Sequence, residues 1–375
     1  MMPYRAENSA RWKWRSRRGT AALARSKPAE SRLQAGLPAP QGEAPSFRRV
    51  RANRCTVIQG EPQMMRANKR SVIPILLLLA LTAYGQQPSL INAVRTLIAG
   101  HDVPAAERLA RSYQARTGPT PELAAAFSWI ARAQFDAKNY DQADALAQET
   151  TKIASRFLMG QKLDDDPWLP TAQGAAIEVH AQVLAARGER AEALEYLRGQ
   201  LKQFTGTSLA ERIRKNINLL SLEGKPAPPL EEKEWLGPKP PSLAALRGHP
   251  VLLFFWAHWC SDCKAEIGII ANLRRTFAPQ GLAVIGPTRL YGYVAGGEDA
   301  PAEKEKLYIE QVRKRFYADL LDMPAPLSAA NFVAYGASST PTLVLIDGGG
   351  IVRYYHPGNA SEAELTARIR AALRK

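Results

Sequence analysis

The chain has 375 residues, enough for two or more domains, and a formal net charge of +15. Residues 1–70 carry 16 Lys/Arg against 4 Asp/Glu, whereas residues 71–375 carry 34 basic and 31 acidic residues. Because the positive charge is concentrated in the N-terminal segment, the sequence excludes a basic nucleic-acid-binding face on the rest of the chain, and no nucleic-acid partner is expected.

The N-terminal 85 residues have the composition of an unfolded segment followed by an export signal. Residues 1–64 mix Arg, Pro, Ala, Ser and Gly without periodicity, which predicts a disordered basic extension. Residues 65–85 combine a basic start, an apolar run over 72–81 and the small residues Ala83 and Gly85, which is the pattern of a secretory signal. That run is shorter than the roughly 20 residues that span a bilayer. The sequence therefore predicts an extracytoplasmic protein, with cleavage near Gly85 or an uncleaved signal anchor.

A signal normally lies at the start of a chain, so the 64 residues before this one need an explanation. We favour translation from Met64 or Met65, which would make residues 1–63 an over-extended gene start. The alternative is a genuine cytoplasmic tail on an uncleaved anchor. Under the first interpretation Cys55 is absent from the exported protein, whose only cysteines are then Cys260 and Cys263.

Residues 88–222 are rich in Ala, Leu, Glu, Arg and Gln at helical spacing, which predicts an all-α domain. Three segments share a pattern in which a small residue lies where a second helix packs on the first. They are 102–109 with Ala106, 139–146 with Ala143, and 189–196 with Ala193.

The spacings between these segments are 37 and 50 residues, and the pattern resembles degenerate tetratricopeptide repeats, whose period is about 34. Such repeats stack into a concave surface that binds a partner protein. A plain helical bundle that supports the next domain is the alternative. Within the longer spacing, residues 164–166 are three aspartates that precede Pro167, which predicts a solvated loop rather than a metal site.

Two cysteines mark a strand-to-helix transition in the C-terminal part. Residues 251–256 are an apolar run with the length of a buried strand, and from Cys263 onward apolar residues recur at helical spacing. Cys260 and Cys263 therefore lie at the start of a helix, where unpaired backbone N–H groups and the helix dipole favour a thiolate. The thiolate is the nucleophilic form of cysteine, so the spacing indicates a redox site.

Two other interpretations of this cysteine pair are weaker. A structural zinc site needs four ligands, and the only other cysteine, Cys55, lies far upstream, while the histidines show no paired spacing. A purely structural disulfide between Cys260 and Cys263 would close a loop too small to restrict the unfolded chain much. We therefore expect no metal, and no cofactor other than a redox-active disulfide.

Residues 256–263, WAHWCSDC, together with Glu266 resemble the active-site segment of the TlpA-like and ResA-like branch of the thioredoxin superfamily. Residues 338–342, SSTPT, resemble the loop of that family in which a cis-proline faces the disulfide, and Pro341 is the matching position. The resemblance implies an α/β thioredoxin-like fold over residues 223–375, preceded by the all-α, tetratricopeptide-like domain.

The remaining elements agree with that order. We expect a strand at 282–286, a loop at 288–300, and a helix over 301–321. A hairpin follows, with strands at 343–347 and 351–355, and a last helix capped by Ser361. The helix over 301–321 is predicted to bury four apolar residues, namely Leu307, Val312, Phe316 and Leu320.

Position suggests a role for each site residue. Cys260 is expected to be the exposed attacking thiolate, and Cys263 to resolve the mixed disulfide. Glu266 lies three residues beyond Cys263 on the same helical face, so it is the predicted proton carrier for the resolving thiol. The resemblance implies that Thr340 and Pro341 contact the substrate, and Trp259 is expected to shield the disulfide from water. Opposite effects of Asp262 and His258 leave the pKa of Cys260 open.

The predicted function is extracytoplasmic thiol–disulfide exchange that reduces disulfides of partner proteins, with a membrane thiol donor restoring the dithiol. The helical domain would bind or position the partner, and cytochrome c maturation is one role that the resemblance allows. The rival interpretation is a helical-repeat scaffold whose redox domain mainly binds. A peroxidase is excluded, because no Pro-x-x-x-[Thr/Ser]-x-x-Cys pattern surrounds Cys260. The sequence predicts no particular oligomeric state.

Overall fold

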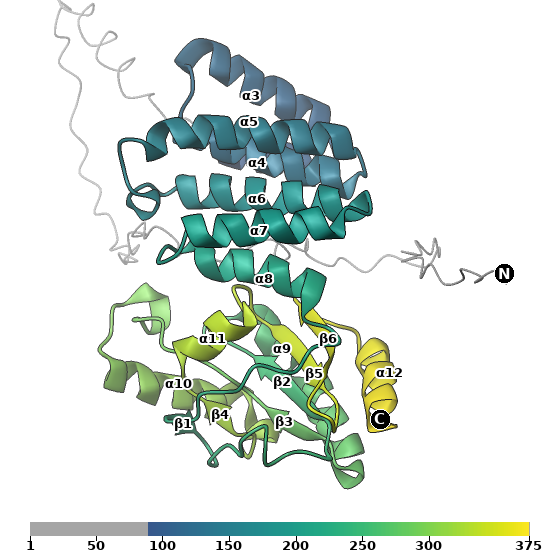
Figure 1. The fold of residues 1–375 in the computed structure, drawn as a ribbon. Helices are drawn as coiled ribbons and strands as arrows, with labels where there is room; N and C mark the ends of the chain where they lie inside the picture. The colour runs from purple at the N-terminus through teal and green to yellow at the C-terminus, as the bar shows by residue number, and fades with distance from the viewer. Residues whose placement is uncertain (1–88, 375) are drawn as a thin grey trace, which may run out of the picture. The chain divides into compact units, whose positions relative to one another are not determined.

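The computed structural model describes residues 89–374 (Figure 1). The predicted basic extension 1–64, the predicted signal 65–85 and Cys55 lie outside the described residues. Among the helices of residues 89–374, none has the length and apolar character needed to cross a membrane.

The first part of the described chain is all-α. Its helices are α2 (Leu90–Ala99), α3 (Val103–Thr117), α4 (Pro121–Asp136), α5 (Tyr140–Leu158), α6 (Leu169–Ala186), α7 (Arg190–Gln203) and α8 (Leu209–Ser221). Side chains of Ser89, Asp102 and Thr120 cap the first three helices by accepting backbone N–H groups. Consecutive helices contact one another along the chain, so neighbours in sequence are neighbours in space (Figure 1).

Three turns in this helical part have the same geometry. Each of the three predicted segments begins the second helix of a pair, and Ala106, Ala143 and Ala193 are fully buried there. In each turn a backbone N–H donates to the carbonyl oxygen five residues earlier over 2.9 Å: Asp102 to Leu97, Asn139 to Gln134, and Glu189 to Leu184. The residue before each donor has a positive φ: His101 at 62°, Lys138 at 65° and Gly188 at 92°. This closure is a Schellman-type helix end used three times.

The three aspartates lie in the loop between α5 and α6, as predicted, and Asp164 and Asp165 are exposed. Leu163–Asp165 form a short 3-10 helix within that loop, and α6 begins at Leu169. The Asp166 carboxylate accepts the N–H groups of Trp168 and Leu169, and Asp164 accepts that of Ser208. Within residues 89–374, no group of three or more His, Cys, Asp or Glu side chains is arranged to hold a metal ion.

The second part of the described chain is built on a four-stranded sheet in the order β3-β2-β5-β6. Strand β2 is parallel to β3 and antiparallel to β5, and β5 is antiparallel to β6. The strands are β2 (Val251–Phe255), β3 (Ala283–Ile285), β5 (Thr342–Ile346) and β6 (Val352–Pro357); β1 (Trp235–Leu236) and β4 (Ala325–Pro326) form a separate pair. The helices are α9 (Ser261–Phe277), α10 (Ala302–Phe316), α11 (Ala329–Tyr335) and α12 (Glu362–Leu373). The predicted α/β thioredoxin-like class is confirmed.

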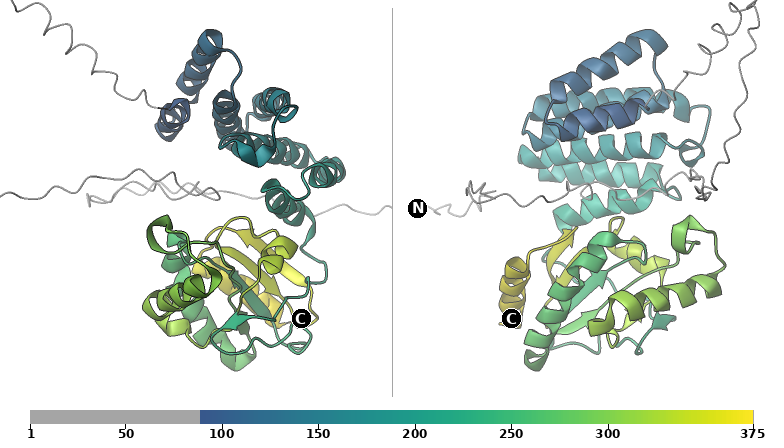
Figure 2. Two further views of the ribbon diagram at one scale, coloured as in Figure 1. Left: turned by 90° about the vertical axis from the view of Figure 1, so that its left-hand side faces the viewer. Right: turned by 180° about the vertical axis from the view of Figure 1, so that it is seen from behind.

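Both faces of the sheet are covered, which explains why β2 is apolar throughout. Leu252 and Phe254 belong to a core formed with α9, α10 and α12, whereas Val251, Leu253 and Phe255 belong to a core formed with α11. Figure 2 shows α9 and α10 in front of the sheet in the view from behind. The final helix is capped by Ser361, whose hydroxyl accepts the N–H of Glu364, as predicted.

The predicted buried face of α10 is wrong at two positions. Leu307 is 69% exposed and Phe316 is 40% exposed. Val312 is buried as predicted, and the other buried side chains of α10 are Ile309 and the charged Glu305 and Arg313. The reason is that both charged groups find buried partners: Arg313 donates to the Leu321 and Met323 carbonyl oxygens, and Glu305 accepts two backbone N–H groups. Helix α11 and the β1–β4 pair were not predicted.

Helix α8 contacts α11 closely. The Asn218 side chain donates to the Tyr335 carbonyl oxygen over 2.8 Å. Gly336, which ends α11, has φ 60°, and a Cβ there would lie 2.5 Å from the backbone nitrogen of Lys215. Both the positive φ and the close backbone approach therefore require glycine at this position.

Candidate redox site

Cys260 and Cys263 are joined as a disulfide at the start of α9, with their Cα atoms 5.3 Å apart. Cys260 is the N-cap of the helix, and its Sγ accepts the backbone N–H of Cys263 over 3.0 Å. The buried strand β2 ends at Phe255, five residues before Cys260, and so fixes where the helix begins. An N–H donor and the positive end of the helix dipole stabilise negative charge on this sulfur.

The prediction that Cys260 is exposed is wrong for this disulfide state: Cys260 is 3% exposed and Cys263 is fully buried. The loop before β5 reaches the Cys260 sulfur. The Cys260 Sγ lies 3.4 Å from the Thr340 carbonyl oxygen, and the Thr340–Pro341 peptide bond is cis, as the resemblance implies. The structure thus brings Cys260, Cys263 and the Thr340–Pro341 segment together.

Trp259, the residue before Cys260, is partly exposed to solvent. It is 39% exposed, and its ring contacts that of Tyr291 edge-on with 5.5 Å between centroids. Trp259 therefore offers an aromatic surface to solvent next to Cys260, while its other side is held by the protein.

Glu266 is a buried carboxylic acid one turn beyond Cys263. It is 2% exposed, and its Oε1 accepts the backbone N–H of Ala360 over 2.9 Å. Its Oε2 has no hydrogen-bond partner among the described residues. Burial raises the pKa of Glu266 to about 7; the Ala360 N–H opposes this rise and the Asp262 charge adds to it. Glu266 can therefore hold or release a proton near neutral pH.

This environment makes a prediction for stability. The pKa of Glu266 is raised from 4.5 in the unfolded chain to about 7 in the fold, so folding favours the protonated side chain. The stability that depends on this proton is fully present below pH 4.5 and is lost as the pH rises through 7. Glu266→Gln should therefore raise the free energy of unfolding of the oxidised protein by about 3 kcal/mol at pH 8. At pH 4 the gain should be near zero. Urea unfolding at both pH values measures the difference, with Glu303→Gln, an exposed glutamate of α10, as control.

Equal effects of Glu266→Gln at pH 4 and pH 8 would show that the carboxylate carries no ionisation penalty in the fold. Glutamine can still accept the Ala360 N–H through its side-chain oxygen, so the comparison isolates the charge.

His258, two residues before Cys260, is fully enclosed. It is 1% exposed, and its Nε2 lies 3.3 Å from Glu305 Oε1. Its ring contacts three tyrosine rings edge-on, at centroid distances of 5.3 to 5.6 Å: Tyr291, Tyr293 and Tyr308. Burial lowers the pKa of His258, Glu305 opposes that effect, and Lys264 adds to it. His258 is therefore neutral at pH 7 and supplies no positive charge to the thiolate of Cys260.

Glu305 is the main element of this site that the sequence did not reveal. It is fully buried in α10, and its two carboxylate oxygens accept the N–H groups of Tyr291 and Gly292 over 2.6 and 2.8 Å. This anchors the 288–300 loop beside His258. The only sequence signal was an acidic residue in the first turn of a helix, which is usually exposed.

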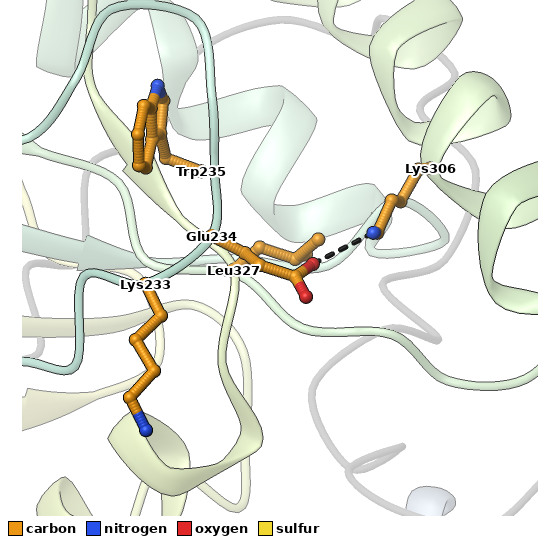
Figure 3. Close-up of a pocket in the computed structure, with 5 residues that line it drawn as sticks. All are labelled: Lys233, Glu234, Trp235, Lys306 and Leu327. Carbon is orange, nitrogen blue, oxygen red and sulfur yellow. Dashed lines mark ion pairs between the residues drawn. The ribbon is translucent and has the colours of Figure 1, made fainter.

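A hollow of about 280 Å³ lies elsewhere on this part of the chain, between the β1–β4 pair and α10 (Figure 3). It is lined by Lys233, Glu234, Trp235, Lys306 and Leu327. The Lys306 ammonium and the Glu234 carboxylate form an ion pair across it, 2.8 Å apart. None of the predicted site residues lines this hollow, so it is separate from the disulfide.

Sequence comparisons with known proteins agree with this chemistry. Residues 224–288 match the AhpC/TSA family. The chain is 33% identical over 145 residues to the thiol:disulfide interchange protein DsbE of Yersinia pestis, covering 38% of this chain and 68% of that protein. It is 29% identical over 150 residues to the thioredoxin-like protein YneN of Bacillus subtilis, covering 39% and 78%. A solved thioredoxin-family thiol:disulfide interchange protein of Chlorobium tepidum matches with 21% identity and a TM-score of 0.31, covering 40% and 97%.

Proposed function

Because the C-terminal part of this chain belongs to the thioredoxin-like thiol:disulfide oxidoreductase family, we propose that it reduces disulfides of partner proteins outside the cytoplasm. The observation that carries the proposal is the Cys260–Cys263 disulfide at the N-terminus of α9, where the Cys263 N–H points at the Cys260 sulfur. A sulfur atom held in this way is stabilised as the thiolate that exchange requires.

In the proposed cycle the Cys260 thiolate attacks one sulfur of the partner's disulfide. That S–S bond breaks, the other partner sulfur leaves as a thiolate, and a mixed disulfide joins Cys260 to the partner. Cys263 then loses its proton and attacks the Cys260 Sγ, which releases the second partner thiol. The partner gains two electrons, and the cysteine pair ends as the disulfide seen in the structure.

We assign the proton of Cys263 to Glu266 in this cycle. Both side chains are buried on the same face of α9, and the pKa of Glu266 is raised to about 7. A carboxylate near its pKa accepts a proton from a neighbouring thiol and returns it to the leaving thiolate at neutral pH. Thr340, whose carbonyl oxygen lies 3.4 Å from the Cys260 Sγ, and Pro341 are the proposed contacts for the partner's backbone, together with the open side of Trp259.

We further propose that the helical part binds or positions the partner as degenerate tetratricopeptide-like repeats. The three Schellman-type turns support this, because a plain bundle has no need to close three turns in the same way. The pairs α2–α3, α4–α5 and α6–α7 would be the repeats, with α8 as the closing helix.

The extracytoplasmic location rests on the signal-like pattern of residues 65–85 and on the relatives named as interchange proteins. In that location a membrane thiol donor would restore the dithiol, and cytochrome c maturation is one pathway that fits a ResA-like reductant.

The reduction potential of the Cys260–Cys263 pair tests the direction of electron flow. The full chain from residue 86 is equilibrated against glutathione or dithiothreitol, and the oxidised fraction is read by thiol alkylation. We expect a value near that of thioredoxin, about −270 mV, which suits a reductant. A value near that of DsbA, about −120 mV, would instead indicate an oxidant that installs disulfides and would overturn the proposed direction.

A further inference from the structure

Helix α8 reaches the redox site through one ion pair. Glu211, in the first turn of α8, accepts a hydrogen bond from Arg289 through its Oε2, 2.7 Å from the Arg289 Nη1. The two side chains are 15% and 24% exposed, so the pair is largely shielded from water. Arg289 belongs to the 288–300 loop, which follows β3.

The guanidinium of Arg289 also contacts two aromatic rings. Its Cζ lies 5.1 Å from the centroid of Tyr291 and 4.6 Å from that of Phe332, a residue of α11. A guanidinium with one ion pair and two cation–π contacts has little freedom to change its orientation. Arg289 therefore fixes the position of the Tyr291 ring relative to α8 and α11.

The Tyr291 ring in turn forms a wall against the two residues that precede Cys260. It contacts Trp259 and His258 at centroid distances of 5.5 and 5.6 Å. Its backbone N–H is held by the buried Glu305. The wall is thus held by Glu305 through its backbone and by Arg289 through its ring.

We propose that Glu211 and Arg289 are positioning residues for thiol–disulfide exchange, so that the helical part completes the redox site rather than serving only to bind partners. The inference rests on the exchange reaction alone. It needs neither the direction of electron flow nor the protein partner proposed above.

A small disulfide separates this role from partner docking. Oxidised glutathione is too small to use a surface on the helical part, so its exchange rate reports on the chemistry at Cys260. In the full chain, Glu211→Gln keeps the size of the side chain and removes its charge. We expect the second-order rate constant of the reduced protein with oxidised glutathione to fall about fivefold, because a loosened Tyr291 wall no longer holds Trp259 in place.

The control removes another ion pair of the redox part. Asp322 pairs with Arg274 of α9, the helix that Cys260 caps, and neither residue of this pair belongs to the 288–300 loop. Asp322→Asn should leave the exchange rate unchanged. The double variant Glu211→Gln with Arg289→Gln should be no slower than Arg289→Gln alone, since the two residues act as one unit.

The pH dependence of Cys260 alkylation is a second measurement, and it should not change if the Glu211–Arg289 pair only stabilises the fold. His258 is faced by Glu305 and Tyr308 from α10, by Lys264 from α9, and by Tyr291 and Tyr293 from the loop. If the Tyr291 ring moves away, water reaches His258 and the lowering of its pKa by burial is relieved. The protonated imidazole then forms more readily and stabilises the nearby Cys260 thiolate. Alkylation of reduced Cys260 in Glu211→Gln should therefore shift to lower pH.

The outcome that would overturn the proposal is a Glu211→Gln protein with the wild-type exchange rate and the wild-type alkylation profile. If the variant also has a lower thermal stability, the Glu211–Arg289 pair stabilises the fold and has no role in exchange. If Arg289→Gln fails to fold, Arg289→Lys serves in its place: it keeps the charge that faces Glu211 and loses the planar stacking, so an intermediate rate is expected.

Discussion

Partner proteins are expected to accumulate as mixed disulfides on Cys260 when Cys263 is replaced by serine. Cys260 has its sulfur at the helix N-terminus, where it accepts an N–H group, and it is the outer cysteine of the pair. Without the second thiol, the mixed disulfide can no longer be resolved from within the protein. Cys260→Ser should instead lower exchange to background, because a serine hydroxyl does not ionise at neutral pH as a thiol does.

The trapped species can be counted on non-reducing gels and identified by mass spectrometry, with the double variant Cys260→Ser, Cys263→Ser as control. If Cys260→Ser captures partners and Cys263→Ser does not, the two roles are reversed. If Cys260→Ser abolishes exchange but partner binding and the cellular phenotype survive, the protein acts mainly as a helical scaffold, and the proposed function fails.

The elements around the disulfide could be predicted because their signals are local. The apolar run of β2 and the helical spacing of α9 lie next to each other in sequence, and the cysteine pair lies between them. The cap at Ser361 was equally local. Glu266 could be placed on the same helical face as Cys263 by spacing alone, although its buried hydrogen-bond partner, the Ala360 N–H, lies 94 residues later.

The parts that escaped prediction depend on contacts between distant segments. Glu305 is charged, so the sequence favoured an exposed position for it. It is buried because its carboxylate accepts two backbone N–H groups of the loop that precedes its helix. Cys260 is buried, and its sulfur is in contact with the Thr340 carbonyl oxygen, 80 residues later. The ion pair between Glu211 and Arg289 joins the helical part to the redox part, which the sequence presents as separate domains. None of these has a period or a spacing that a pattern can detect.

Glu266→Gln should slow the resolving step by about a hundredfold at pH 7 while leaving the first attack intact. The pKa of Glu266 is raised to about 7, mainly by burial, so the carboxylate that accepts the Cys263 proton becomes available as the pH rises through 7. Glutamine keeps the hydrogen bond from Ala360 but cannot accept the proton. Cys260 does not depend on Glu266, because its thiolate is stabilised by the Cys263 N–H.

A chromogenic aromatic disulfide separates the two steps in one stopped-flow trace. Attack by Cys260 releases the first coloured thiolate, and resolution by Cys263 releases the second. In the wild type the second phase should rise with pH and level off above about pH 7, where Glu266 becomes ionised. In Glu266→Gln that inflection should vanish, and the gap to wild type should narrow at high pH, where solvent deprotonates the thiol directly. Glu303→Gln, on the exposed face of α10, should match the wild type in both phases. An unchanged second phase in Glu266→Gln would mean that Cys263 loses its proton by another route, and that the buried acid has no part in resolution.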